Sequence, residues 1–160
     1  MKVGQVLRDL HGAENDLTHG LLRLSDHHRV DHEIYHLARD LAGWSQQHLV
    51  VIARVAQRYG QDLEPEPEHE PGSAARLRSA VGLAVGRNDA PGLVLLRDLR
   101  DVYLQAAGVY TDWEMVAQAA QALKDAGLVS LAETCMAQTK RQMAWANGKL
   151  KESSSQVLLS

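Results

Sequence analysis

The sequence has no phenylalanine and a single cysteine, Cys135. One cysteine excludes a disulfide within the chain and is typical of a protein in a reducing compartment. No apolar run approaches the roughly 20 residues that a membrane-spanning helix needs. The start of the chain includes Arg8 and Asp9 and lacks the apolar core of a signal peptide. We therefore expect a cytoplasmic protein without a membrane segment.

Neither sign of charge dominates the sequence. The formal net charge is -3, and acidic and basic residues are interspersed along the chain. Proteins that bind nucleic acids or membrane surfaces usually concentrate basic residues in one patch. Neither nucleic acid nor a membrane is therefore expected as a partner.

Aromatic side chains are also scarce, at 4% of the 160 residues, and the alternating runs typical of β-strands are missing. The hydrophobic fraction of 45% comes mostly from Leu, Ala and Val. Such a composition favours helices, and a chain of this length can form one domain with its own core. We predict a single all-α domain.

Two apolar seams, each with one ionisable residue, organise the first part of the chain. Their residues recur at alternating spacings of four and three, as on one side of an amphipathic helix. Glu14 interrupts the first seam and His48 the second. Because a seam packs against neighbouring helices, both groups are expected to be buried. The seams are Val3, Leu7, Leu10, Glu14, Leu17, Leu21 and Leu24, followed by Ile34, Leu37, Leu41, Trp44, His48, Val51, Val55 and Tyr59.

Capping and turn signals divide the chain into four long helices and a shorter one. Asp31 can cap the second helix, and Gly60 stands where a left-handed residue would end it. Ser130 and Glu133 fit a capping box at the start of the last helix. Prolines and acidic residues predict an extended linker over 60–72. The predicted helices are 3–27, 31–59, 73–86, 90–126 and 130–152.

The connection lengths predict how the helices are arranged. A short turn near residue 29 makes the first two helices an antiparallel hairpin, and the last two long helices form a second hairpin in the same way. The connection from 60 to 90 is long enough to run the length of a bundle. We therefore predict a four-helix bundle with a single crossover.

This architecture, with an acid and a histidine facing inward from the first hairpin, resembles the ferritin-like superfamily. Its di-iron members place Glu on the first helix, Glu-x-x-His on the second, Glu on the third and Glu-x-x-His on the fourth. Glu14 matches the carboxylate of the first helix, and His48 matches the histidine of the second. The hairpin puts the two at about the same level, roughly one helical turn apart.

The other ligand positions of the superfamily are not matched. Ser45 stands where the carboxylate of the second helix would be. Tyr103 and Tyr110 occupy the candidate places on the third helix, and the fourth offers Glu133-x-x-Met136. The resemblance therefore implies the fold, but a di-iron centre of the usual kind is not expected.

Two interpretations of the Glu14–His48 pair remain open. The first is a buried polar network that fixes the helix register. The second is a mononuclear metal site formed with His11, which would hold one iron, manganese or zinc ion. In both, the surrounding residues would be Trp44, Ser45, Tyr103 and Tyr110.

A second group of histidines is spaced for metal binding. His28, His32 and His36 are four residues apart, a spacing that can chelate Zn, Ni or Cu from one helix face. The stripe lies off the seam, and solvated histidines are the alternative.

The sequence thus predicts a non-catalytic, ferritin-like helical bundle that binds a protein or a small ligand. A homo-oligomer or a protein partner is expected, and no cofactor. The alternative is a metal-binding or metal-handling oxidoreductase-like protein with a reduced site at Glu14 and His48. Nothing near the pair resembles a nucleophile or an oxyanion hole, which weighs against an enzyme.

Overall fold

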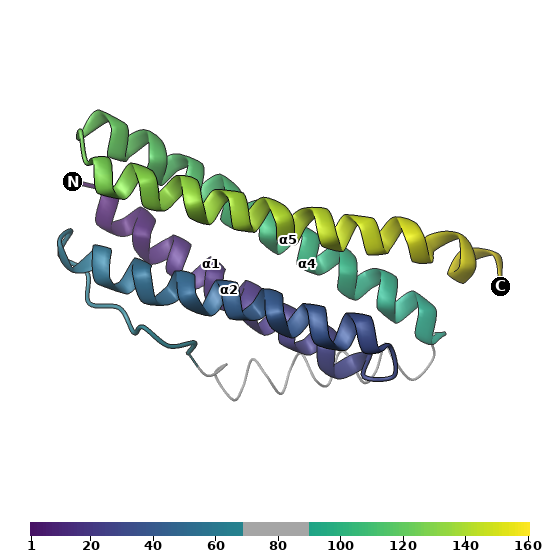
Figure 1. Ribbon diagram of the computed structural model, residues 1–160. Helices are drawn as coiled ribbons and strands as arrows, with labels where there is room; N and C mark the ends of the chain where they lie inside the picture. Colours follow the sequence, from purple (N-terminus) through teal and green to yellow (C-terminus); the bar gives the residue numbers. More distant parts are fainter. Residues whose placement is uncertain (69–89) are drawn as a thin grey trace.

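Four long helices make up the described part of the chain, residues 1–68 and 90–160 (Figure 1). In this computed structural model they are α1 (Val3–His27), α2 (His32–Gln57), α4 (Pro91–Ala122) and α5 (Ala126–Leu159). The described residues contain no strand, so the predicted all-α class is confirmed. None of these helices combines the length and apolar character that crossing a bilayer requires. The helix predicted over 73–86 lies outside the described residues.

The helices form two antiparallel hairpins, α1 with α2 and α4 with α5. In Figure 1, α4 begins at the end of the bundle where α2 begins. The hairpins lie side by side, with α1 next to α4 and α2 next to α5. Every neighbouring pair of helices is therefore antiparallel, and side chains from all four helices can meet in the middle of the bundle.

The first helix of each hairpin ends in a tight turn, and the turn between α4 and α5 differs from the prediction. Lys124 adopts the left-handed conformation (φ 57°), and Asp125 accepts a hydrogen bond from a backbone N–H in the first turn of α5. Asp125 is therefore the N-cap in place of Ser130. The preceding helix was predicted to run to 126 but ends at Ala122, and Gly127 lies in the first turn of α5.

The last helix also continues beyond its predicted end at 152, to Leu159. The serines in this stretch do not interrupt it, and Ser154 Oγ bonds back to the carbonyl oxygen of Leu150. Val157 packs closely on Gly92, since a Cβ atom added to Gly92 would lie 2.8 Å from the Val157 methyl carbons. This contact fixes the end of α5 against the start of α4.

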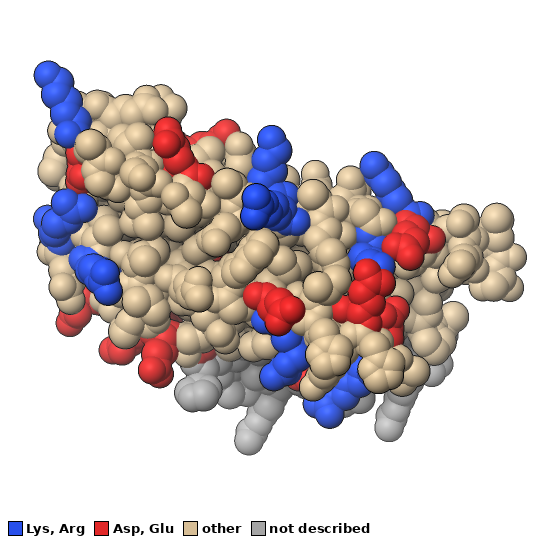
Figure 2. Space-filling model, viewed as in Figure 1, with Lys and Arg blue, Asp and Glu red and all other residues tan. Residues whose placement is uncertain are grey.

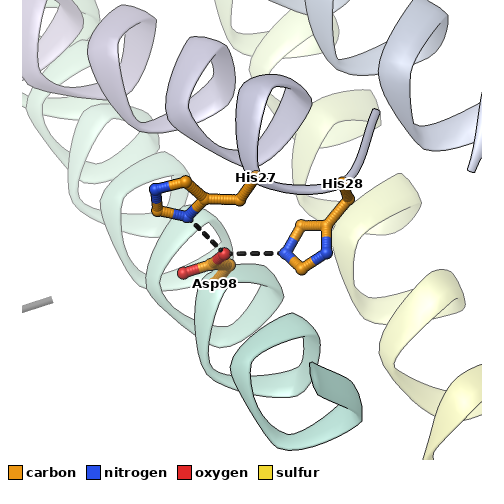
Figure 3. A group of neighbouring side chains, drawn as sticks. All are labelled: His27, His28 and Asp98. Atoms are coloured by element: carbon orange, nitrogen blue, oxygen red, sulfur yellow. Dashed lines mark hydrogen bonds and ion pairs between the residues drawn. The ribbon is translucent and has the colours of Figure 1, made fainter. Parts of the chain in front are cut away.

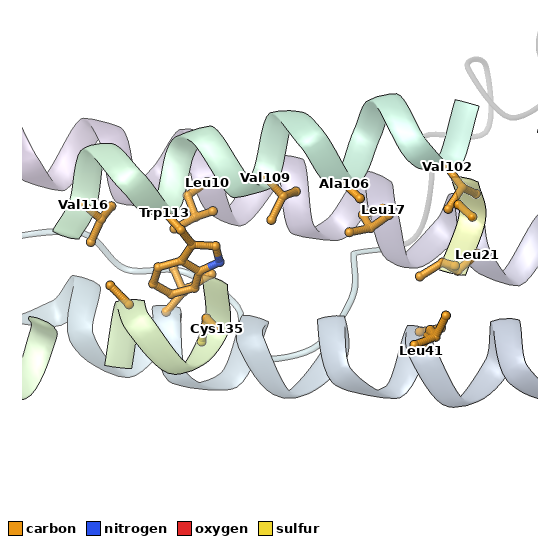
Figure 4. Packing of buried hydrophobic residues seen from close by; sticks show 14 of the residues in the cluster. Leu10, Leu17, Leu21, Leu41, Val102, Ala106, Val109, Trp113, Val116 and Cys135 are labelled. Carbon is orange, nitrogen blue, oxygen red and sulfur yellow. The ribbon is translucent and has the colours of Figure 1, made fainter. Parts of the chain in front are cut away.

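The core is built mainly from Leu and Ala side chains. Leucines of α1 face valines and alanines of α4, and the Trp113 ring is the largest side chain that is fully buried (Figure 4). Alanines at the contacts allow helix axes to approach closely. The members with no measurable exposure include Leu7, Leu10, Leu17, Leu21, Ala38, Ala42, Leu49, Ile52, Leu99, Ala106, Val109, Trp113, Ala120, Leu128, Ala132 and Ala146.

The buried face of α2 is rotated from the predicted seam. All seam residues of α1 from Leu7 to Leu24 are buried, but on α2 Leu37 is 36% exposed, and Trp44 and Val51 are half-buried. Ala38 and Ala42 are fully buried instead. Alanine has a small side chain and gives a weak hydrophobic signal in the sequence. The predicted seam of α2, which follows the large apolar residues, therefore lies toward the edge of the buried face.

The start of the long connection is packed along α1. α2 ends at Gln57, and Gly60, with φ 75°, turns the chain back. Residues 61–68 contain no helix. His11 Nε2 lies 2.7 Å from the Glu64 carbonyl oxygen, and the Glu68 backbone N–H donates to Asn15 Oδ1 at 2.9 Å. This part of the predicted linker therefore covers the outer side of α1.

Candidate functional site

A buried ion pair joins the two hairpin helices α1 and α2. Glu14 has no exposed surface and His48 is 2% exposed. Nδ1 of His48 lies 2.6 Å from Oε1 of Glu14. The antiparallel turn brings the two residues to the same level, and the seam phase turns both toward the middle of the bundle. The pairing expected from the sequence is thus present in the structure.

The second hairpin completes the surroundings of the pair. From α4, the Trp113 indole N–H donates to Glu14 Oε1 at 3.0 Å, and its ring stands edge-on to the His48 imidazole with centroids 6.1 Å apart. From α5, Gln138 Oε1 lies 2.7 Å from His48 Nε2, and Cys135 contacts the same ring. Each of the four helices therefore contributes a side chain to one polar layer.

The geometry favours a protonated imidazole. Both ring nitrogens of His48 face oxygen acceptors, so both can donate only if the ring carries two protons. Burial by itself would lower the pKa of His48, but hydrogen bonds to Cys135 and Glu14 outweigh it and raise the pKa from 6.5 to about 10. The pair is therefore an imidazolium and a carboxylate held in the core.

A second polar contact lies one helical turn further along α5. Gln142 Nε2 donates to the Leu41 carbonyl oxygen and to Ser45 Oγ, both at 2.9 Å. Two buried oxygens in this region, Glu14 Oε2 and Gln142 Oε1, have no hydrogen-bond partner in the described part of the chain. The polar layer is otherwise satisfied by its own members.

The remaining residues predicted to surround the pair are placed elsewhere or take other contacts. His11 is buried but bonds to the linker at Glu64, away from the Glu14 carboxylate. Ser45 bonds to Gln142. Trp44, Tyr103 and Tyr110 are half-buried. Within the described part of the chain, none of these five side chains forms a hydrogen bond with Glu14 or His48.

The sequence did not identify the residues that contact the Glu14–His48 pair. A buried tryptophan needs an acceptor for its indole N–H, and that signal could have identified Trp113. Gln138 and Gln142 carry no comparable signal, because a glutamine in an amphipathic helix is usually read as part of the solvated face. Cys135, Gln138 and Gln142 share one side of α5, since they are spaced by three and four residues.

The predicted histidine stripe is not formed. His28 is the C-cap of α1 and lies outside α2, whereas His32 and His36 are exposed and stack on each other in the first turns of α2. At the same end of the bundle, His27 and His28 instead converge on Asp98 of α4 (Figure 3). Burial would raise the pKa of Asp98, but hydrogen bonds from His28 and His27 lower it below its ordinary value.

A two-metal centre of the superfamily type does not fit the residues around Glu14 and His48. Such a centre needs bridging carboxylates from several helices. Here Ser45 on α2, Trp113 on α4 and Gln138 on α5 occupy the layer, and Glu14 is its one acid. Within the described ranges, three metal-ligating side chains come within 4.8 Å of one another only at His27, His28 and Asp98. The residues of the pair could hold a single cation only if the imidazolium lost a proton.

Two surface hollows among the described residues lie away from the pair. One is an open depression beside the α4–α5 turn, lined by Gln121, Lys124 and Glu133 among others. A smaller one lies between α1 and α4 and is lined by Gly20 and Asp98. Neither of these two hollows is lined by Glu14 or His48.

No protein-family model, curated protein sequence or solved structure matches the chain. The function is therefore inferred from the geometry of the chain alone.

Proposed function

We propose that the chain is a non-catalytic, ferritin-like helical bundle that acts by binding a protein partner. The observation that carries this proposal is the enclosure of the buried Glu14–His48 ion pair. Glu14 and His48 are sealed from solvent, and the atoms that could do chemistry are taken up by Trp113, Gln138 and each other. A substrate would have no route to them, so the pair has a structural role. We also propose a cytoplasmic location, since the buried Cys135 is a free thiol.

The face formed by α2 and α5 is the best candidate for the contact with a partner. Gln138, Gln142 and Lys149 bond to residues of α2, so their side of α5 faces α2. Trp145 lies on the same side, because 138, 142, 145 and 149 are spaced by four, three and four residues. Its indole nitrogen is buried and unpartnered among the described atoms.

The α2 edge of this face is apolar and only partly buried. Leu37, Trp44 and Val51 are spaced by seven residues. Each lies one helical turn from Leu41 or His48, which bond to α5. Figure 2, in the view of Figure 1, shows an uncharged area left of the middle of this side, where α2 and α5 are in front, with Lys, Arg, Asp and Glu side chains near the middle and around the edges. We name Leu37, Trp44, Val51 and Trp145 the α2–α5 face.

A second copy of the chain is the partner that this face fits best. A two-fold contact places the same apolar row of each copy against the other and needs no opposite charge on the partner. α2 has 26 residues and is about 39 Å long, so a strip two helices wide covers on the order of 800 Å², the area that a standard interface buries on each side.

Sedimentation equilibrium of the full chain tests this proposal. We expect dimers of the wild-type protein and monomers of the Leu37→Glu variant, because a buried carboxylate without a partner disfavours association. Leu104→Glu on α4 is the matched control, since Leu104 is 49% exposed but lies on another helix. A monomeric wild-type chain would contradict the proposed self-association. If Leu104→Glu dissociates the dimer as fully as Leu37→Glu does, the α2–α5 face is not the interface.

One observation favours the alternative function, metal binding or metal handling at a reduced site. Glu14 Oε2 is a buried oxygen without a described partner, and a cation could satisfy it if His48 gave up its proton. Elemental analysis of protein purified without an affinity tag tests this. One equivalent of iron, manganese or zinc per chain that is lost in Glu14→Gln and retained in Asp98→Asn would support the alternative. A content near zero would exclude it.

A further inference from the structure

Three potential metal ligands meet where the end of α1 crosses α4 (Figure 3). His27 and His28 are consecutive, at the end of α1 and at its C-cap, and Asp98 lies two turns into α4. His27 Nδ1 is 3.0 Å and His28 Nε2 is 2.8 Å from Asp98 Oδ2. All three ligand atoms lie within 4.8 Å of one another. Two imidazoles and one carboxylate thus point at one place from two helices.

We propose that His27, His28 and Asp98 form a binding site for a divalent transition-metal ion, with zinc as its representative. Two histidines and a carboxylate are ligands that zinc uses in proteins, with bonds of about 2.0 Å. In a tetrahedral site with such bonds the donor atoms are about 3.3 Å apart. The two His–Asp98 separations of 3.0 and 2.8 Å need to open by only a few tenths of an ångström. The two imidazole nitrogens, which lie within 4.8 Å of each other, need to reach the same spacing.

The electrostatics of this place suit a cation. His28 caps the C-terminus of α1, where unpaired carbonyl groups give the helix end a partial negative charge. On binding, the metal replaces the imidazole protons that now point at Asp98. The site therefore exchanges two hydrogen bonds for three coordinate bonds.

The burial of the three side chains leaves one side of the site open. The His28 side chain is 13% exposed, Asp98 is 23% exposed and His27 is 51% exposed. Three protein ligands with an open side leave a fourth position for water or for a group from another molecule. The His32–His36 pair differs, because both rings are exposed and, among the described residues, it belongs to no such three-ligand group.

Titration calorimetry of the tag-free full chain with Zn²⁺ tests the site. We expect one ion per chain, and a loss of affinity of at least about tenfold in Asp98→Asn, since even indirect partners of a metal ligand contribute 10–100-fold. His27→Gln, at a largely exposed ring, should weaken binding similarly. The double variant His32→Ala/His36→Ala is the matched control and should bind zinc as the wild-type chain does.

Thermal unfolding with and without Zn²⁺ separates loss of the site from loss of the fold. Zinc should raise the melting temperature of the wild-type chain and of the His32/His36 double variant but not that of Asp98→Asn, because only bound ligand stabilises the native state. The proposal is overturned if the wild-type chain binds no zinc. It is equally overturned if zinc binding survives in Asp98→Asn and His27→Gln and disappears in the double variant. These outcomes are independent of the α2–α5 face and of the Glu14–His48 pair.

Discussion

The indole N–H of Trp113 donates to Oε1 of Glu14, the same oxygen that accepts the hydrogen bond from His48. Trp113 is on α4 and Glu14 is on α1, so this bond connects the two hairpins at the level of the ion pair. The Glu14 carboxylate is thereby held from two directions. Together, Glu14, His48 and Trp113 set the relative register of α1, α2 and α4.

Trp113→Phe should destabilise the protein by about 1.5–3 kcal/mol, because the variant loses a hydrogen bond to a buried charge. The change in the free energy of unfolding can be measured by urea denaturation. Trp145→Phe is the control, since the Trp145 indole nitrogen has no described partner. This variant should lower the free energy of unfolding much less. Equal losses in the two variants would contradict the role given to the Trp113–Glu14 bond.

Glu14→Gln and His48→Gln should each be strongly destabilising, by roughly 3–5 kcal/mol, because each leaves a buried charge without its partner. The double variant should be more stable than the sum of the single losses predicts, with a coupling energy of about 1–3 kcal/mol. A double-mutant cycle by urea denaturation measures this coupling. Additive losses would show that the two side chains act independently.

The stability of the protein should fall as the pH rises from about 6.5 to about 10. The pKa of His48 is raised to about 10 in the folded protein from 6.5. Below pH 6.5 the folded and unfolded states both carry the proton, and the stabilisation is complete. Above it the unfolded state releases the proton first, so stability declines by up to ~1.4 kcal/mol per pH unit until the folded state is also deprotonated.

This pH dependence can be measured by urea denaturation at a series of pH values between 6 and 10, with His48→Gln as the reference. The difference in stability between the wild-type chain and the variant should shrink over this interval. A constant difference would mean that His48 is not protonated in the core.

Gly4→Ala should destabilise the protein, although alanine is the better helix former. A Cβ atom at position 4 would lie 2.5 Å from the backbone oxygen of Tyr59, so the start of α1 would have to move away from the end of α2. We expect a net loss of about 1–2 kcal/mol after the helix-propensity gain is subtracted. Gly12→Ala on the same helix has no atom within 4 Å of the added carbon. It should stabilise the protein by up to about 1 kcal/mol in thermal or urea unfolding.

The Glu14–His48 contact could be predicted from the sequence because it depends on two local patterns. Each residue interrupts a seam of large apolar residues, and a short turn between long helices fixes which levels face each other. Leucines mark the buried side of α1 clearly, so the phase of Glu14 was correct. The burial of His48 followed in the same way, although the buried face of α2 extends further toward Ala38 and Ala42.

The contributions of α5 could not be predicted in the same way. Two capping residues, Asp125 and Ser130, lie close together at its start, and the choice between them depends on the left-handed conformation of Lys124. Gln138 and Gln142 give no hydrophobic signal, and their roles depend on the tertiary placement of α5 against α2. His11 was predicted as a third ligand of a metal site at the pair, but in the structure it bonds to the Glu64 carbonyl oxygen of the linker.

The packing of residues 61–68 along α1 has a consequence for the order in which the protein opens. α1 has neighbours on three sides, namely α2, α4 and this segment. Its central amides should therefore exchange with deuterium most slowly, at the rate of global unfolding. The last turn of α5, where Leu158 and Leu159 are 63% and 87% exposed, should exchange much faster than the α1 amides, through local fraying.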